Sequence, residues 1–248
     1  MTEAPALEVI ELRKFFGGVP ATQDISLRVR AGERRLIIGP NGAGKTTLFN
    51  QISGDFLPTS GQIKLFGKDV TRLKPHQRAQ LGLARTYQII TLFAKDTLEH
   101  NIALGLIGLM RARWNMLRPL SLYGDLKSQT QQVLAEVGLD HLGQARVGEL
   151  AYGEKRRVEI AMALAQRPKL LLLDEPLAGL SSAERGAVKQ LIASIPRETT
   201  IIMIEHDMDT ALDLAETVTL LHYGKVIVDG ARDSVIADAR TREVYLGH

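Results

Sequence analysis

The chain of 248 residues contains no cysteine, which excludes disulfide bonds and thiolate metal sites and fits a reducing compartment. The longest apolar run, Ile102 to Met110, is far shorter than the roughly 20 residues that a helix needs to span a bilayer. The N-terminus lacks the basic start and apolar core of a signal peptide. There is no long basic block either, so nucleic-acid binding is not expected. These absences predict a soluble protein of the cytoplasm.

What remains is an ordinary globular composition, with 45% hydrophobic and 24% charged residues and a mild net charge of +3. Such a chain is long enough for a sizeable buried core, and disorder is not indicated. We find no internal repeat and no low-complexity tract, so the chain is expected to carry one nucleotide-binding domain and not two.

The most specific pattern is G-x-x-x-x-G-K-[ST], which is filled at every position by residues 39–46. An apolar segment fit for a buried strand, 35–38, precedes it, and residues 47–52 after it have helical spacing, with Leu48, Phe49 and Ile52 on one face. A glycine-rich turn between a strand and a helix cradles phosphate oxygens with its backbone N–H groups. Lys45 is expected to reach the β/γ-phosphates and Thr46 to offer its hydroxyl to Mg²⁺.

Elsewhere the chain alternates between strand and helix signals. Three strands are expected before the loop and a strand pair after it, followed by a mainly helical region over 75–166 with a short strand near 85–89. Buried parallel strands, a hairpin around Gly224 and short helices complete the chain. The expected strands and helices are 9–12, 25–29, 36–38, 58–70 (a pair), 156–166 (helix), 169–173, 199–205, 217–223, 225–229 and 231–246 (short helices).

Polar side chains follow two of the apolar strands. Asp174 and Glu175 end the run of leucines at 170–173, and His206 follows the run at 201–204. Ligands of parallel sheets bind at the carboxyl ends of the strands. Asp174 is therefore expected to hold Mg²⁺ through water, Glu175 to act as general base on the attacking water, and His206 to contact the γ-phosphate or position that water.

Two further segments are candidates with weaker local signals. Gln88 ends the short strand signal and could be a ligand of Mg²⁺ or of the water. Residues 150–155 precede the expected helix at 156–166, whose N-terminal end could receive an anion. Taken alone, both segments are also compatible with purely structural roles.

In their sequence order these motifs resemble the ATP-binding-cassette (ABC) ATPases, and the resemblance covers essentially the whole chain. It implies an α/β fold: a P-loop NTPase core with a RecA-like, mostly parallel sheet, an antiparallel β subdomain and an inserted α-helical subdomain. Residues 1–88 and 167–248 would form the core and about 89–166 the helical subdomain of one domain spanning 1–248. The implied cofactors are ATP and Mg²⁺.

The resemblance also implies a role for each motif. Phe16 matches the aromatic residue that stacks on adenine, Gln88 the Q-loop, and His206 the switch histidine. Lys45, Gln88, Glu175 and His206 would be catalytic, and Thr46, Gln88 and Asp174 would serve the metal. The nucleotide would be bound by Phe16, Gly39, Pro40, Asn41, Gly42, Ala43, Gly44, Lys45, Thr46 and Thr47, and by the signature residues Ala151, Tyr152, Gly153 and Glu154.

Two motifs depart from the family pattern. The usual signature Leu-Ser-Gly-Gly-Gln is here Leu-Ala-Tyr-Gly-Glu at 150–154, so the serine hydroxyl expected on the γ-phosphate is missing. The D-loop aspartate is replaced by Ser181, which forms an S-x-x-E capping box with Glu184. Contacts across an ATPase dimer are therefore less well defined by the sequence than contacts within the subunit.

The departures, together with Phe16-Gly17-Gly18 and the ending 245–247, look like the ATPases of branched-chain or hydrophobic amino-acid importers. This likeness implies a second ATPase subunit in a homo- or heterodimer, two membrane permeases and an external solute-binding protein, at the cytoplasmic face of the plasma membrane. An apolar patch at 89–93 would dock the permeases or pack internally. Urea or amide importers, lipopolysaccharide exporters and soluble ABC ATPases remain alternatives, as does a nucleotide sensor without turnover. A GTPase is disfavoured, because no Asn-Lys-x-Asp segment is present, and a small-molecule kinase leaves the signature helix unexplained.

Overall fold

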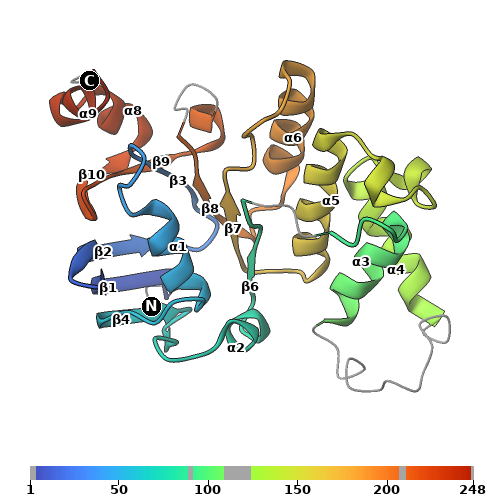
Figure 1. Ribbon diagram of the computed structural model, residues 1–248, viewed down its shortest axis with the longest axis horizontal. Coiled ribbons are helices and arrows are strands. Elements are labelled where there is room, and N and C mark those ends of the chain that lie inside the picture. The colour runs from blue at the N-terminus through green and yellow to red at the C-terminus, as the bar shows by residue number, and fades with distance from the viewer. Residues whose placement is uncertain (1–3, 89–91, 109–123, 207–210, 247–248) are drawn as a thin grey trace. The chain divides into compact units, whose positions relative to one another are not determined.

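The computed structural model has an α/β fold, as predicted, and divides into two compact units (Figure 1). The residues that it describes are 4–88, 92–108, 124–206 and 211–246. The first unit consists of Met1–Arg85, Lys169–Ala178 and Pro196–His248, and the second of Thr86–Pro168 and Gly179–Ile195.

The first unit contains two sheets. A six-stranded sheet, mostly parallel, has the order β10-β9-β3-β8-β7-β6, and a four-stranded antiparallel sheet has the order β2-β1-β4-β5. The strands of the first sheet are β3 (Arg34–Ile38), β6 (Leu83–Arg85), β7 (Leu170–Asp174), β8 (Thr200–Ile204), β9 (Thr217–His222) and β10 (Lys225–Ala231). Those of the second are β1 (Leu7–Phe16), β2 (Val19–Val29), β4 (Ser60–Leu65) and β5 (Lys68–Asp69). The predicted hairpin around Gly224 is confirmed as the antiparallel pair β9–β10.

Helix α1 (Lys45–Ser53) belongs to the core that both sheets share. Leu48, Phe49 and Ile52 are fully buried and cluster with side chains of β1, β2 and β4 on one sheet and of β3, β7 and β8 on the other. This confirms the helical face predicted after the phosphate loop. The short helices of this unit are α2 (Pro75–Gln80), η5 (Leu212–Leu214), α8 (Arg232–Ala237) and α9 (Ala239–Leu246).

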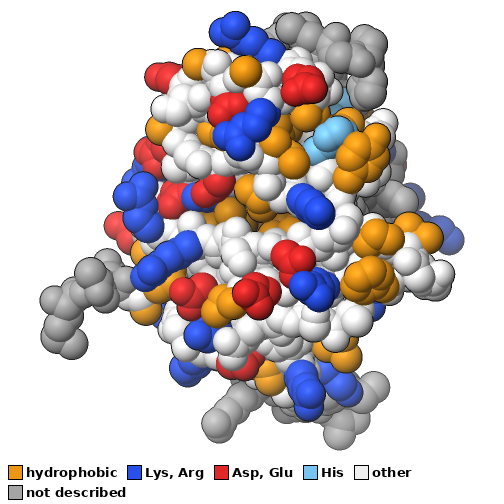
Figure 2. Space-filling view, turned by 90° about the vertical axis from the view of Figure 1, so that its left-hand side faces the viewer, with side chains coloured by type: hydrophobic (Ala, Val, Ile, Leu, Met, Phe, Trp, Pro, Cys, Tyr) orange, Lys and Arg blue, Asp and Glu red, His pale blue; other side chains and the backbone are white. Residues whose placement is uncertain are grey.

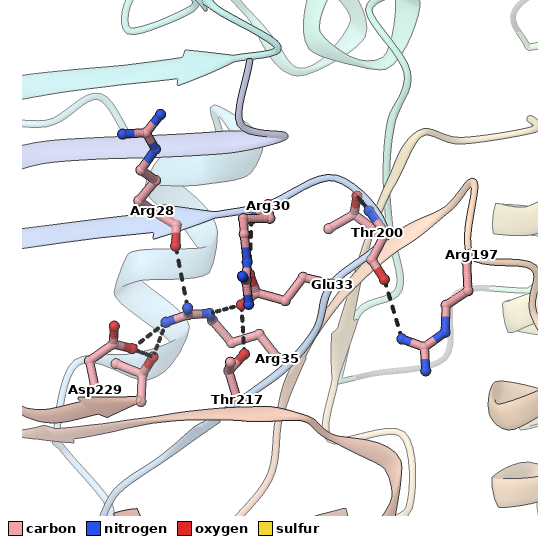
Figure 3. A network of polar contacts seen from close by, with 10 residues as sticks. Arg28, Arg30, Glu33, Arg35, Arg197, Thr200, Thr217 and Asp229 are labelled. Atoms are coloured by element: carbon pink, nitrogen blue, oxygen red, sulfur yellow. Dashed lines mark hydrogen bonds and ion pairs between the residues drawn. The ribbon is translucent and has the colours of Figure 1, made fainter. Parts of the chain in front are cut away.

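The two sheets are also joined by a buried arginine, Arg35, at the start of β3 (Figure 3). Its guanidinium donates to Glu33 Oε1 at 2.8 Å, to Thr219 Oγ1 of β9 at 2.8 Å and to Asp229 of β10. It also donates to the carbonyl oxygen of Arg28, in β2 of the other sheet, at 3.3 Å. Arg35 thus bonds β3 to three other strands, β2, β9 and β10, and so connects the two sheets of the unit.

Glu33 shares that site. Burial opposes ionisation of its carboxyl, but hydrogen bonds from Thr217 and from the Arg30 backbone, together with the charge of Arg35, lower its pKa overall. The buried pair of Glu33 and Arg35 is thus charged and hydrogen-bonded, which is the condition under which buried ions are tolerated.

The second unit is helical in the residues described. Its helices are α3 (Leu98–Ile107), α4 (Gly124–Glu136), η3 (Asp140–Leu142), η4 (Val147–Glu149), α5 (Tyr152–Ala165) and α6 (Ser182–Ser194). Helix α3 packs on α4 and α5, and α5 packs on α6 (Figure 1). The capping box predicted for Ser181 and Glu184 is confirmed at the start of α6.

Two predicted elements need correction. The short strand expected at 85–89 is β6 at Leu83–Arg85, because the N–H and C=O of Tyr87 bond to side chains of α5 and so cannot join the sheet. The helix expected from residue 156 begins at Tyr152, where the Glu154 carboxylate accepts the N–H of Ala151 at 2.8 Å. In the apolar patch predicted at 89–93, residues 89–91 lie outside the described part of the chain, while Phe93 is exposed.

The surface carries charge of both signs. On the face that Figure 2 presents, basic and acidic side chains lie among one another, and hydrophobic side chains gather along one side. Within the described residues, every helix falls short of the length and apolar character that a bilayer crossing requires.

Candidate functional site

The phosphate loop at 39–46 joins β3 to α1, in the strand–loop–helix context that the pattern predicts. Two of its glycines leave no room for a side chain. A Cβ at Gly39 would lie 2.2 Å from the carbonyl oxygen of Leu221, and one at Gly44 would lie 2.4 Å from that of Ala21. Gly44 also has φ +99° as the residue that caps α1, a conformation that glycine adopts without strain. The loop is thus held closely between β9 and β2.

Lys45 is the first residue of α1, and it is 6% exposed. Its Nζ donates to the carbonyl oxygens of Gly39 at 2.6 Å and Pro40 at 3.1 Å, so the side chain folds back over the loop. Burial lowers the pKa of this ammonium group, and the negative charges of Glu175 and Asp174 oppose that shift. A weakly solvated cation over a loop of backbone N–H groups can attract phosphate oxygens.

The strand register brings the predicted acids and the histidine to the same edge of the parallel sheet. Strand β8 lies between β3 and β7, with Ile204 opposite both Ile37 and Asp174. The carboxyl ends of β3, β7 and β8 therefore lie at the same level of the sheet. The phosphate loop follows β3, Glu175 follows β7 and His206 comes shortly after β8. Asp174 is 2% exposed, Glu175 half-buried and His206 exposed.

Asp174 is held by a neighbour that sequence reasoning missed. Arg85, at the end of β6, donates to Asp174 Oδ2 at 2.8 Å. The same guanidinium donates to Asn50 Oδ1 at 2.6 Å and Ser53 Oγ at 2.9 Å, both on α1, and its side chain is 5% exposed. Arg85 therefore connects the buried acid to the helix that follows the phosphate loop.

Phe16, the predicted adenine-stacking residue, ends β1 and is 44% exposed. Its ring meets that of Phe56 edge to face at a centroid distance of 5.5 Å, and Lys14 Nζ lies 5.1 Å from its centroid. One flank of the ring is thus supported by an aromatic neighbour, while a large part of its surface stays accessible for stacking.

Gln88 belongs to the second unit, and its side chain is exposed. Its segment is fixed to α5 through a buried pair, Arg156 and Glu159, whose charged groups are 2.6 Å apart. Glu159 accepts the N–H of Tyr87 at 3.0 Å, and Arg156 donates to the carbonyl oxygen of Tyr87 at 3.1 Å. An Arg and a Glu three residues apart in this helix were the only signal in the sequence for this anchor.

The signature segment forms the first turn of α5 in the same unit. Tyr152 is exposed, and the N–H of Gly153 donates to Glu184 Oε1 of α6 at 2.9 Å. A Cβ at Gly153 would lie 2.6 Å from Cγ of Glu184, so glycine is required for this close approach. The predicted site residues thus fall into two groups: the phosphate loop, Phe16, Asp174, Glu175 and His206 in the first unit, and Gln88 with Ala151–Glu154 in the second.

The donors near the phosphate loop suit a magnesium ion. Thr46 is exposed at the N-terminus of α1, and Asp174 supplies a carboxylate from the end of β7. Mg²⁺ prefers hard oxygen ligands and is commonly bound by one or two carboxylates together with substrate phosphates. The residues present fit this ion when a nucleotide supplies the remaining oxygens.

Comparison with known proteins agrees with this arrangement. A family model described as "ABC transporter" matches residues 22–178. The chain is 35% identical to the high-affinity branched-chain amino acid transport ATP-binding protein BraF of Pseudomonas aeruginosa and 33% identical to LivG of Escherichia coli, which carries the same description, with 98% of each chain covered in both cases.

Solved structures show the same likeness. An ATP-binding cassette of an ABC transporter in its ADP conformation superposes with a TM-score of 0.86 at 28% identity, and both chains are covered completely. The protein cbiO1 from Clostridium perfringens, described as part of the ABC transporter complex cbiONQ, gives a TM-score of 0.82 at 28% identity, with 99% of this chain and 97% of that chain covered.

Proposed function

The chain belongs to the ABC transporter family as an ATP-binding, ATP-hydrolysing subunit, and on this premise we propose that it powers the import of branched-chain or other hydrophobic amino acids. The observation that supports this substrate class is the full-length likeness to ATPases described as serving branched-chain amino-acid transport. The departures in the signature and D-loop segments point to the same group of ATPases.

In the proposed mechanism the triphosphate lies in the loop at 39–46, where backbone N–H groups and Lys45 neutralise its charge. Glu175 accepts a proton from the attacking water, and His206 steadies the γ-phosphate. The strand register supports these roles, because β3, β8 and β7 end at the same level and the phosphate loop, His206 and Glu175 follow these three ends. Phe16 offers its open face to the adenine.

Magnesium would be held by Thr46 and by Asp174, the latter through water, with Gln88 as a further ligand of the ion or of the water. When bound, the ion would neutralise charge on the β- and γ-phosphates. Arg85 would keep the Asp174 carboxylate in place, since it bonds one of its oxygens.

The proposed assembly contains two ATPase subunits that bind head to tail, with each ATP between the phosphate loop of one subunit and Ala151–Glu154 of the other. The proposed partners are a second ABC ATPase, identical or related, two transmembrane permeases and, indirectly, an extracytoplasmic solute-binding protein. The chain would work at the cytoplasmic face of the plasma membrane. A known cassette described as part of a transporter complex supports this form of assembly for the family.

The test is uptake of radiolabelled leucine by cells of the source organism that lack the gene. We expect uptake to fall to background in these cells and to return with the wild-type chain, but not with Lys45→Ala, which removes the cation on the phosphates, or with Glu175→Gln, which removes the proposed general base. Charge-stabilising and acid–base groups of this kind typically contribute about 10²- to 10⁴-fold in rate.

Uptake of radiolabelled urea, measured in the same cells, is the control for substrate class. Loss of urea uptake with intact leucine uptake would refute amino-acid import and leave the ATPase assignment standing. Unchanged uptake of both compounds would exclude both substrate classes.

A further inference from the structure

Glu205 is a buried acid that the proposed mechanism does not use. It follows the last residue of β8 and is 1% exposed, although charged side chains are seldom fully buried without a partner. Its Oε1 accepts the backbone N–H of Leu177 at 2.9 Å. Leu177 lies two residues after Glu175, so the bond reaches the turn that carries the proposed general base.

That turn has an unusual backbone. Glu175 has φ +47°, in the left-handed region that disfavours residues with a side chain. Its N–H donates to the carbonyl oxygen of Ile204 at 3.0 Å, and its own carbonyl oxygen accepts the N–H of Ala178 at 3.2 Å. Strained backbone of this kind persists only where its surroundings hold it. The bonds that Ile204 and Glu205 accept are made with the end of β8.

The carboxyl of Glu205 can serve as an acceptor whether or not it is ionised, because each form keeps an oxygen lone pair. Burial raises its pKa to about 7, against the opposing effects of the Leu177 N–H and of His206, and the charge of Glu175 adds to the rise. His206 Nδ1 lies 3.9 Å from Glu205 Oε2. The carboxyl of Glu205 therefore lies near both His206 and the turn at Glu175, and it accepts its hydrogen bond from Leu177 in that turn.

We propose that Glu205 is a positioning residue for the proposed general base: its hydrogen bond to the Leu177 N–H holds the left-handed turn that places Glu175. The inference rests on the proposed role of Glu175. Without an acceptor the Leu177 N–H, which belongs to a residue that is 3% exposed, would be buried and unpaired. The turn could then relax to a common backbone conformation and move the carboxylate of Glu175.

Two variants of the complete chain separate the acceptor from the charge. Glu205→Leu removes the acceptor, whereas Glu205→Gln removes the charge and keeps an amide oxygen in its place. Glu205→Asp, a smaller change that withdraws the oxygen by one methylene, replaces Glu205→Leu if the latter does not fold. Glu198→Leu is the control, since Glu198 is an exposed glutamate close to the opposite end of β8.

Two measurements are made on each variant. Hydrogen exchange of the Leu177 amide without nucleotide reports the bond itself, and we expect exchange to be at least about tenfold faster in Glu205→Leu. ATP hydrolysis should slow by roughly 10- to 100-fold in Glu205→Leu, the effect of a small misplacement of a catalytic group, while ATP affinity changes by less than about threefold. Glu205→Gln and Glu198→Leu should match the wild type in both measurements.

Wild-type hydrolysis in Glu205→Leu would overturn the proposal, and so would an equal loss in Glu205→Leu and Glu205→Gln, because the acceptor would then not be the cause. A parallel measurement on Glu175→Gln separates this failure from failure of the proposed function. If Glu175→Gln hydrolyses ATP as fast as the wild type, the role of Glu175 itself is wrong, whatever the Glu205 variants do.

Discussion

Individual residues of the phosphate loop were predictable because a local pattern defines their chemistry. Lys45 and the glycines of the loop are contiguous in sequence, and the structure places the loop between a strand and a helix as expected. Arg85 and Glu205 were not predictable in the same way. Their partners, Asp174 and Leu177, become neighbours only through the pairing of β6, β7 and β8. No local spacing contains that information.

The buried carboxyl of Glu205 leads to a pH-dependent prediction. Its pKa of about 7 in the folded chain exceeds the ordinary value of 4.5, so the folded state keeps its proton more tightly than the unfolded state. The resulting stabilisation is complete below pH 4.5 and is lost as the pH rises through about 7. The shift corresponds to about 3 kcal/mol.

Because glutamine does not titrate, we expect the stability of Glu205→Gln relative to the wild type to rise by about that amount, 3 kcal/mol, between pH 4.5 and pH 8. Urea unfolding of both proteins without nucleotide, at several pH values in that range, measures the difference. A difference that stays constant with pH would show that Glu205 titrates normally in the folded chain.

At the scale of elements, the long apolar strands and the hairpin were predicted well because their hydrophobic patterns are strong and buried. The errors occurred where side chains accept backbone N–H groups. The carboxylate of Glu159 takes the N–H of Tyr87 from the sheet, and that of Glu154 starts α5 earlier than its apolar pattern suggests. Both carboxylates lie on α5, and for Glu159 the contact is made with a distant part of the sequence.

The capping box of α6 was predicted from sequence alone, and its contribution to stability can be measured. Ser181 Oγ accepts the N–H of Glu184 at 3.4 Å, while Glu184 Oε2 accepts the N–H of Ser181 at 2.9 Å. We expect Ser181→Ala to lower the free energy of unfolding by about 1 kcal/mol, because an N–H of the first turn loses its acceptor. Chemical denaturation checks this value.

Ser182→Ala, one position into the helix, is the matched control for that experiment. Ser182 is an exposed first-turn residue, so its replacement should change the free energy of unfolding by less than about 0.5 kcal/mol. Equal losses in the two variants would show that the box does not act as a cap.

At the scale of the whole molecule, family membership and fold class were predictable because six motifs occur in a fixed order along the chain. The assignment of each residue to its role stays a prediction, since those roles depend on the nucleotide and on partner subunits. The two groups of site residues lie in separate units of the chain, and the dimer proposed for them is tested below.

The proposed head-to-tail dimer can be tested with the full-length chain. Glu175→Gln should bind ATP and hydrolyse it at least about 100-fold more slowly, so the nucleotide persists and a dimer accumulates. Size-exclusion chromatography with and without Mg-ATP measures the shift in mass, and Lys45→Ala should remain monomeric in both. Identical elution of Glu175→Gln with and without ATP would refute an ATP-dependent homodimer.

The neighbours of β3 have a consequence for how the protein is made. Strand β3 lies between β8 and β9, whose residues 200–204 and 217–222 emerge from the ribosome long after residues 34–38. Until then its backbone groups have no sheet partner, and such late, non-local pairing is slow and leaves nascent chains prone to association. The phosphate loop is thus synthesised early, whereas the sheet that holds it is completed late. Nascent chains stalled before β9 should therefore depend on chaperones.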